Sequence, residues 1–217
     1  MPEGSNTYRV SDVAVRVKRQ FGDEAGVQVT DADIFRWVND GQREIAAKND
    51  LLRTRAAADI VAGQNTYGNP PDVLRFISVY YDGNPLRHIN FQEADGWILS
   101  QDPSVALSGK PTIWYSFANE ILLYPKPDAD IAGGLVSYYS QLPAAVTSLD
   151  NTIALPDRYF SRLLEFVMAQ AYEMDDDWTA AGNKVSQLNS ALQEASEEEN
   201  TTQHAVYPSI TVLPEDY

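Results

Sequence analysis

The sequence contains no cysteine and only two histidines among its 217 residues. The absence of cysteine excludes disulfide bonds, thiolate metal sites and cysteine nucleophiles. No apolar run reaches the ~18 residues that a membrane-spanning helix needs. The opening segment, Met1-Pro2-Glu3-Gly4-Ser5, lacks the pattern of a secretory signal peptide. We therefore expect a protein that is made in the cytoplasm and does not contact a membrane.

Lysine and arginine are scarce, with 16 of them against 31 Asp and Glu, which gives a net charge of −15. Residues 151–217 hold much of this excess, because they contain 12 Asp or Glu and 3 Lys or Arg. Such a charge argues against wrapping a nucleic acid, whose binding depends on neutralising phosphates. It allows a surface that lies near DNA without adhering to it. The scattered arginines are expected on a solvated sheet edge: Arg53, Arg55, Arg75 and Arg87.

The order of the predicted elements indicates an α+β fold, in which a helical bundle carries an inserted antiparallel β-sheet domain and an extended C-terminal tail. Apolar residues at helical spacing predict helices over residues 8–21 and 30–51, and Thr30 begins a capping box. Period-two alternation then predicts one antiparallel sheet of about five or six strands, with a hairpin turn at Asp82-Gly83. The predicted divisions are N-terminal helices over 1–52, a β-rich insertion over 53–150, a helical hairpin over 151–200 and a tail over 201–217.

The second helix of the predicted hairpin carries an apolar seam with a period of ~3.5 residues. Its members are Trp178, Ala181, Val185, Leu188, Leu192 and Ala195. A narrow seam of this kind suits packing along another long helix, here the predicted helix over Pro156–Met174. The seam either presents a flank to a neighbouring copy as well or serves only as core within the subunit. Both interpretations stay open from the sequence. The candidate subunit-packing residues are Trp178, Val185, Leu188 and Leu192.

Motifs of catalytic or metal-binding chemistry are weak. The two histidines, His88 and His204, lie far apart in sequence, and surface roles are favoured over metal binding. Asp175-Asp176-Asp177 lacks the alternation and closing glutamate of a calcium loop, so turn and helix-cap roles are favoured. No Gly-x-Ser-x-Gly elbow occurs, and Pro111 argues against a phosphate loop at Gly109-Lys110-Pro111-Thr112. We therefore predict that the protein is not an enzyme and has no catalytic residues, metal ligands or cofactor.

Three segments carry a resemblance to a known family. The first is Phe35-x-Trp37-x-Asn39-x-Gly41-Gln42-Arg43-Glu44-Ile45-Ala46, in the second predicted helix. The second is Gly109-x-Pro111-x-x-x-Tyr115 followed by Ile121-x-Leu123-Tyr124-Pro125-x-Pro127, and the third is Leu155-Pro156-x-x-Tyr159 at the start of a long helix. Over residues 30–200, this pattern and order of elements resemble the head-to-tail adaptor (connector) proteins of tailed bacteriophages.

This resemblance implies a structural protein of the virion neck that forms a ring, commonly of twelve copies, beneath the portal at the capsid vertex. The implied partners are sibling copies, the portal protein and a tail or nozzle protein, and DNA passes through the channel without specific binding. Carboxylates that line such a channel repel phosphates, so the DNA slides. The candidate channel-lining residues are Asp175, Asp176, Asp177, Glu194, Glu197, Glu198 and Glu199. Solvated helix ends are the competing interpretation of these acids.

A proline-bracketed, β-branched segment follows the acidic run. Ile210-Thr211-Val212-Leu213 is too short to fold alone but is suited to adding a strand to an exposed sheet edge. In the resembled family the C-terminal segment docks onto the portal. The candidate portal-docking residues are accordingly Tyr207, Ile210, Val212, Leu213 and Tyr217. We expect residues 201–217 to be disordered in a free monomer and ordered in the assembled particle.

A second function is compatible with the aromatic content of the predicted sheet. In this alternative, the protein is a virion-associated carbohydrate- or receptor-binding module, and its binding surface is formed by Trp114, Tyr115, Tyr138 and Tyr139. The mass of the purified protein separates the two functions. An adaptor forms rings, alone or with a portal, whereas a monomer that binds glycans favours the alternative.

Overall fold

The computed structural model describes residues 7–97 and 107–206. The chain divides into two compact units, one formed by Met1–Leu51 with Pro143–Tyr217 and the other by Leu52–Leu142. We call them the helical unit and the β unit. Their helices and largely antiparallel sheets confirm the predicted α+β class.

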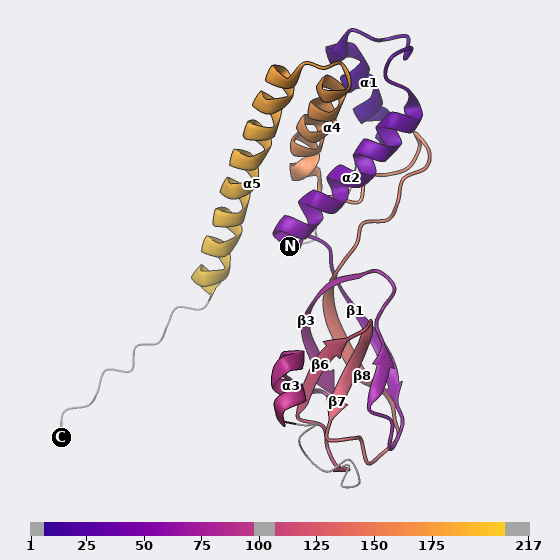
Figure 1. Ribbon diagram of the computed structural model, residues 1–217, viewed down its shortest axis with the longest axis vertical. Coiled ribbons are helices and arrows are strands. Elements are labelled where there is room, and N and C mark those ends of the chain that lie inside the picture. The colour runs from indigo at the N-terminus through magenta and orange to yellow at the C-terminus, as the bar shows by residue number, and fades with distance from the viewer. Residues whose placement is uncertain (1–6, 98–106, 207–217) are drawn as a thin grey trace, which may run out of the picture. The chain divides into compact units, whose positions relative to one another are not determined.

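The helical unit is built around α4, which contacts α1, α2 and α5 (Figure 1). The elements are α1 (Val10–Phe21), α2 (Asp31–Asn49), the 3-10 turn η1 (Asp157–Tyr159), α4 (Phe160–Met174) and α5 (Trp178–Val206). The apolar residues of α4 recur at helical spacing, so Leu163, Val167 and Ala171 are buried together along one side. α4 therefore supplies the core onto which the other helices pack.

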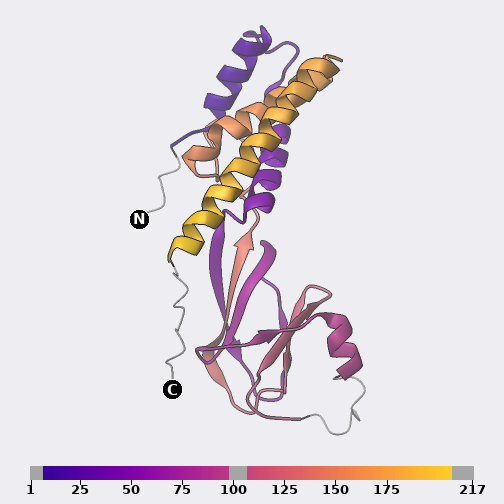
Figure 2. The same ribbon diagram turned by 90° about the vertical axis from the view of Figure 1, so that its left-hand side faces the viewer.

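α5 is nearly twice as long as α4 and continues past its end (Figure 2). It ends at Val206, so residues 201–206, the first part of the predicted tail, are helical. The remainder of that predicted tail, residues 207–217, lies outside the described residues.

Two polar residues of the first resemblance segment attach α2 to the chain that returns from the β unit. The side chain of Asn39 donates to the backbone carbonyl of Val146 (3.0 Å) and accepts from its N–H (2.8 Å). The Oε1 atom of the buried Gln42 accepts a hydrogen bond from the N–H of Ala154 (2.7 Å). Buried backbone groups need such partners when no regular structure supplies them. The segment therefore carries part of the fold.

A single carboxylate organises the loop between α1 and α2. The Oδ1 atom of Asp23 accepts a hydrogen bond from the N–H of Val27 (2.9 Å), and Oδ2 accepts from Gln28 and Val29 (2.8 Å each). The N–H of Val29, followed by that of Val27, lowers the pKa of Asp23 below its ordinary value of 3.8. The charged form of Asp23 is thus the form that stabilises the loop.

We expect the stability of the protein to fall as the pH is lowered below about 4, and the Asp23→Asn variant to show a shallower fall. The pKa of Asp23 is lower in the folded state than in the unfolded state. The stabilisation is therefore complete above the unfolded pKa and is lost as the pH decreases through the folded pKa. Urea denaturation at a series of pH values measures this effect. Asp40→Asn removes the same charge from an exposed site on α2 and should keep the wild-type profile.

The β unit contains two sheets, whereas the sequence pattern predicted one. One sheet has the order β1-β8-β3-β4 and the other β2-β7-β6-β5. The only parallel pair between the described strands is β5 with β6. The bounds are β1 (Arg53–Ile60), β2 (Thr66–Gly68), β3 (Val73–Tyr81), β4 (Asn84–Pro85), β5 (Arg87–His88), α3 (Phe91–Trp97), β6 (Ile113–Phe117), β7 (Glu120–Tyr124) and β8 (Ile131–Gln141).

The prediction of one sheet fails at the strand that follows the hairpin turn. The turn itself is present, with Asp82 and Gly83 both in the left-handed region (φ 47° and 73°). Asn84–Pro85 then pairs with β3, but Arg87–His88 pairs with β6 in the other sheet. The buried Leu86 lies at the crossing point and belongs to the core of the unit. The segment that follows the turn is therefore divided between two sheets.

The core of the β unit lies between the two sheets. The first sheet contributes Ile60, Val79 and Leu135, and the second contributes Tyr67, Trp114, Ile121 and Leu123. Successive residues of a strand face opposite sides of a sheet. Because Leu135 and Val79 face the core, Tyr138 and Tyr80 lie on the outer face of the first sheet.

Candidate protein-interaction surfaces

The acidic triplet Asp175-Asp176-Asp177 forms the corner between α4 and α5. Asp175 is the C-cap of α4, and Asp176 has a left-handed backbone with φ of 59°. The Oδ1 atom of Asp177 accepts a hydrogen bond from the N–H of Ala180 (3.1 Å) and caps the first turn of α5. All three side chains are exposed. The triplet thus has the turn and capping roles expected of it, and its charges face solvent.

The apolar seam of α5 divides into a buried stripe and an exposed flank. Ala181, Leu188 and Leu192 are buried where α5 packs on α4. Trp178 is 67% exposed and Val185 is 38% exposed. The structure therefore places Leu188 and Leu192 in the core of the helical unit and leaves Trp178 and Val185 accessible.

Helix geometry explains this division. Each residue of an α-helix is rotated by about 100° around the helix axis from the one before it. Viewed down the axis of α5, Trp178 and Val185 therefore lie roughly 60° and 40° from Ala181, both on the same side. They consequently share one flank of α5, beside the stripe that meets α4. Met174, the last residue of α4, is also exposed and precedes the corner. We call Met174, Trp178 and Val185 the α5 flank.

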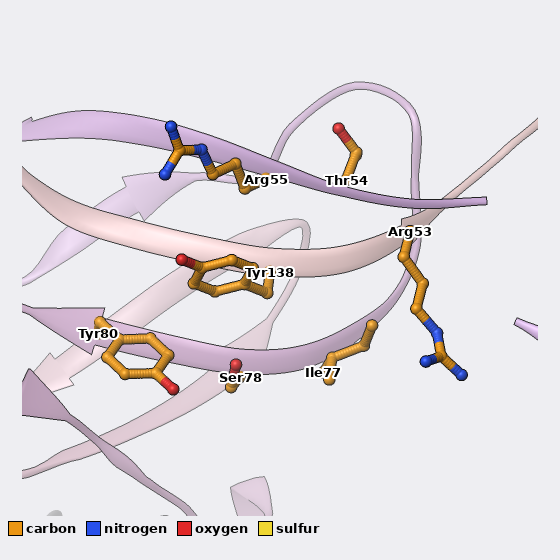
Figure 3. Close-up of a pocket in the computed structure, with 7 residues that line it drawn as sticks. All are labelled: Arg53, Thr54, Arg55, Ile77, Ser78, Tyr80 and Tyr138. Carbon is orange, nitrogen blue, oxygen red and sulfur yellow. The ribbon is translucent and has the colours of Figure 1, made fainter. Parts of the chain in front are cut away.

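A second surface lies on the outer face of the first sheet of the β unit. It is a groove of about 490 Å³ lined by Arg53, Thr54, Arg55, Ile77, Ser78, Tyr80 and Tyr138. Figure 3 shows that β1, β8 and β3 each contribute to it. We call it the arginine–tyrosine groove. The sequence interpretation treated these arginines as scattered, but pairing places both on one face: Arg53 is opposite Ser140 of β8, and Arg55 is opposite Tyr138.

The four aromatic residues of the carbohydrate-binding alternative do not share one exposed surface. Trp114, Tyr115 and Tyr139 are buried, and burial raises the pKa of the Tyr115 and Tyr139 hydroxyls. Tyr139 also donates its hydroxyl to Asp72 (3.0 Å). Of the four aromatic residues proposed to stack on a sugar, Tyr138 is the one exposed, at 38%. Buried rings serve as core, so these four residues do not form a stacking platform.

The remaining predicted site residues lie at the end of the described chain or beyond it. The acidic residues Glu194, Glu197, Glu198 and Glu199 belong to α5. The predicted portal-docking residues Tyr207, Ile210, Val212, Leu213 and Tyr217 lie outside the described residues. Across the side chains that the structure describes, no group of three or more His, Asp or Glu is arranged to hold a metal ion. None of the described helices combines the length and apolar character needed to cross a bilayer.

Comparison with known proteins places this geometry in context. The model of one protein family, described as SU10 adaptor protein, matches residues 8–210. The match includes both units and all of the described helices and strands. A search of curated proteins found no match.

Proposed function

We propose that this chain, which belongs to the SU10 adaptor protein family, forms a ring between the portal and the tail of a phage virion. Membership makes it a structural adaptor protein of a phage, associated with other virion components. The ring, its position in the neck and its DNA channel are our proposal. The family match over residues 8–210 is the observation that carries it.

The α5 flank supports the proposal of a ring. Each subunit of a closed ring presents two different surfaces that repeat around an axis. An exposed tryptophan beside a smaller apolar residue is typical of the anchors at protein interfaces. We therefore propose that Trp178 and Val185 contact a neighbouring copy, while Leu188 and Leu192 hold the hairpin that presents them.

Acidic residues suit the proposed passage of DNA. The exposed triplet Asp175–Asp177 and the glutamates from Glu194 to Glu199 carry negative charge. No lysine or arginine follows Lys184 in the sequence, so none lies near the glutamates along the chain. A channel lined by acidic side chains would repel the phosphates of DNA. It would also offer no basic surface that could bind DNA by neutralising phosphates and releasing counterions. We propose that the triplet Asp175–Asp177 lines the channel, and we assign the glutamates at the end of α5 to a contact between subunits, argued in the next section. We also propose that the segment from Tyr207 to Tyr217 docks onto the portal by adding a strand to an exposed sheet edge.

The mass of the purified protein, alone and mixed with purified portal, tests the proposed function. We expect a multimer of one defined mass, either alone or on the portal, and we expect deletion of residues 207–217 to remove the portal contact while the fold survives. Light scattering gives the mass, and circular dichroism verifies the fold of the truncated chain. A protein that stays monomeric under both conditions would refute the ring, and normal portal binding after truncation would refute the docking role of the tail.

A further inference from the structure

We propose that the arginine–tyrosine groove binds the acidic end of α5 from a neighbouring copy. We call residues 194–199 the acidic arm. The inference rests on the proposed ring and adds to it a second, electrostatic contact between subunits. It assigns a function to the outer face of the β1-β8-β3 sheet, where Tyr138 is 38% exposed.

Strand register builds the groove from three strands. On one side of Tyr138 lies Arg55 of β1, and on the other lies Ser78 of β3. The rings of Tyr80 and Tyr138 meet edge to face, with centroids 5.5 Å apart and planes at 71°. The register of β3 shifts between Phe76 and Ser78, and this irregularity leaves Ile77 half exposed beside the groove.

The groove has the chemistry of a carboxylate-binding surface. Arginine presents a planar set of N–H donors that matches a carboxylate, and tyrosine hydroxyls add further donors. Arg53 and Arg55 lie on the same strand, two residues apart, so both project to this face of the sheet. An aromatic and aliphatic floor supplied by Tyr138 and Ile77 would pack against the apolar stems of glutamate side chains.

A polypeptide fits this groove better than a nucleic acid does. Binding to DNA depends on many phosphate contacts, and the groove offers two arginines in a chain of net charge −15. A short run of glutamates carries less charge and needs fewer partners. The ligand is therefore expected to be an acidic protein segment.

This chain supplies such a segment on a projecting helix. The acidic arm holds Glu194, Glu197, Glu198 and Glu199, and no lysine or arginine occurs anywhere after Lys184. The 29 residues of α5 span about 43 Å, against about 22 Å for the 15 residues of α4. The end of α5 consequently extends beyond α4 (Figure 2). An unlike pair of surfaces, one basic and one acidic on every copy, is what a head-to-tail ring requires.

Charge reversal tests the contact. We expect Arg53→Glu with Arg55→Glu to raise the concentration needed for half-assembly at least about tenfold, because like charges then face each other. The arm variant Glu197→Arg, Glu198→Arg, Glu199→Arg should have the same effect. Arg87→Glu with Lys110→Glu reverses the same number of charges at exposed sites outside the groove and should assemble normally. The midpoint of thermal unfolding verifies that each variant is folded, and Arg55→Glu alone provides a milder second variant.

Mixing the two defective variants distinguishes a contact between copies from one within a copy. In an alternating ring, each reversed groove meets a reversed arm of the neighbour, so an equimolar mixture should recover assembly. If the mixture stays defective and assembly recovers only in a chain that carries both reversals, the contact lies within one copy and the proposal is wrong. Normal assembly of the groove variant by itself would also overturn the proposal. A wild-type protein that never assembles, with or without portal, would instead refute the proposed ring itself.

Discussion

Trp178→Glu combined with Val185→Glu is expected to abolish ring assembly and to leave the fold of the subunit intact. Both side chains are exposed on the α5 flank, so their replacement removes little packing within the subunit. Glutamate also suits the first residue of α5, because a negative charge near a helix N-terminus is favourable, and it has a higher helix propensity than valine.

The expected loss of association is large. Truncation of a tryptophan anchor at a protein interface commonly costs 2 kcal/mol or more, which corresponds to about a 30-fold weaker contact. The introduced charges add a desolvation cost at the same position. Light scattering at increasing protein concentration measures the effect, and the unfolding midpoint verifies the fold.

A matched variant separates the α5 flank from general surface charge. Val15→Glu with Val27→Glu adds the same two charges at exposed valines of the helical unit, on α1 and on the loop after it. This control should assemble as the wild type does. If the flank variant forms rings as readily as the control does, Trp178 and Val185 take no part in the subunit contact.

Local signals in the sequence predicted the elements that depend on neighbours in the chain. The capping box at Thr30 is present, with the N–H of Asp33 donating to Thr30 Oγ1 (3.3 Å) and the Asp33 carboxylate accepting from the N–H of Thr30 (3.3 Å). The turn at Asp82-Gly83 follows from residues that tolerate a left-handed backbone. These features need only a few consecutive residues, so a single sequence is enough to predict them.

Pairing between distant strands was not predictable in this way. Arg87–His88 comprises two residues, and its pairing with β6 instead of β3 depends on a strand that lies about 25 positions further along the chain. The arginine–tyrosine groove was missed for the same reason. Arg55 and Tyr138 are 83 positions apart, and only the register of β1 on β8 brings them together. The division of the α5 seam likewise depends on the direction from which α4 approaches.

The resemblance segment around Gly41 leads to a prediction about stability. A β-carbon at Gly41 would lie 2.7 Å from Leu163 Cδ1 and 2.8 Å from Phe166 Cδ1. Leu163 is fully buried in a close-packed interior, so a β-carbon at position 41 would force these side chains or the two helices to shift. The requirement for glycine here is one of space between two helices.

Gly41→Val is accordingly expected to destabilise the protein by about 2–3 kcal/mol, because overpacking forces side chains and backbone to shift. The unfolding midpoint should decrease by roughly 5–10 °C. Gly182→Val provides the matched control, since Gly182 also lies within a helix but has no atom within 4 Å of its β-carbon position. The control should be close to neutral, because valine has a slightly better helix propensity than glycine. If thermal melts show the same midpoint for both variants, the close contact between α2 and α4 is not what selects glycine at position 41.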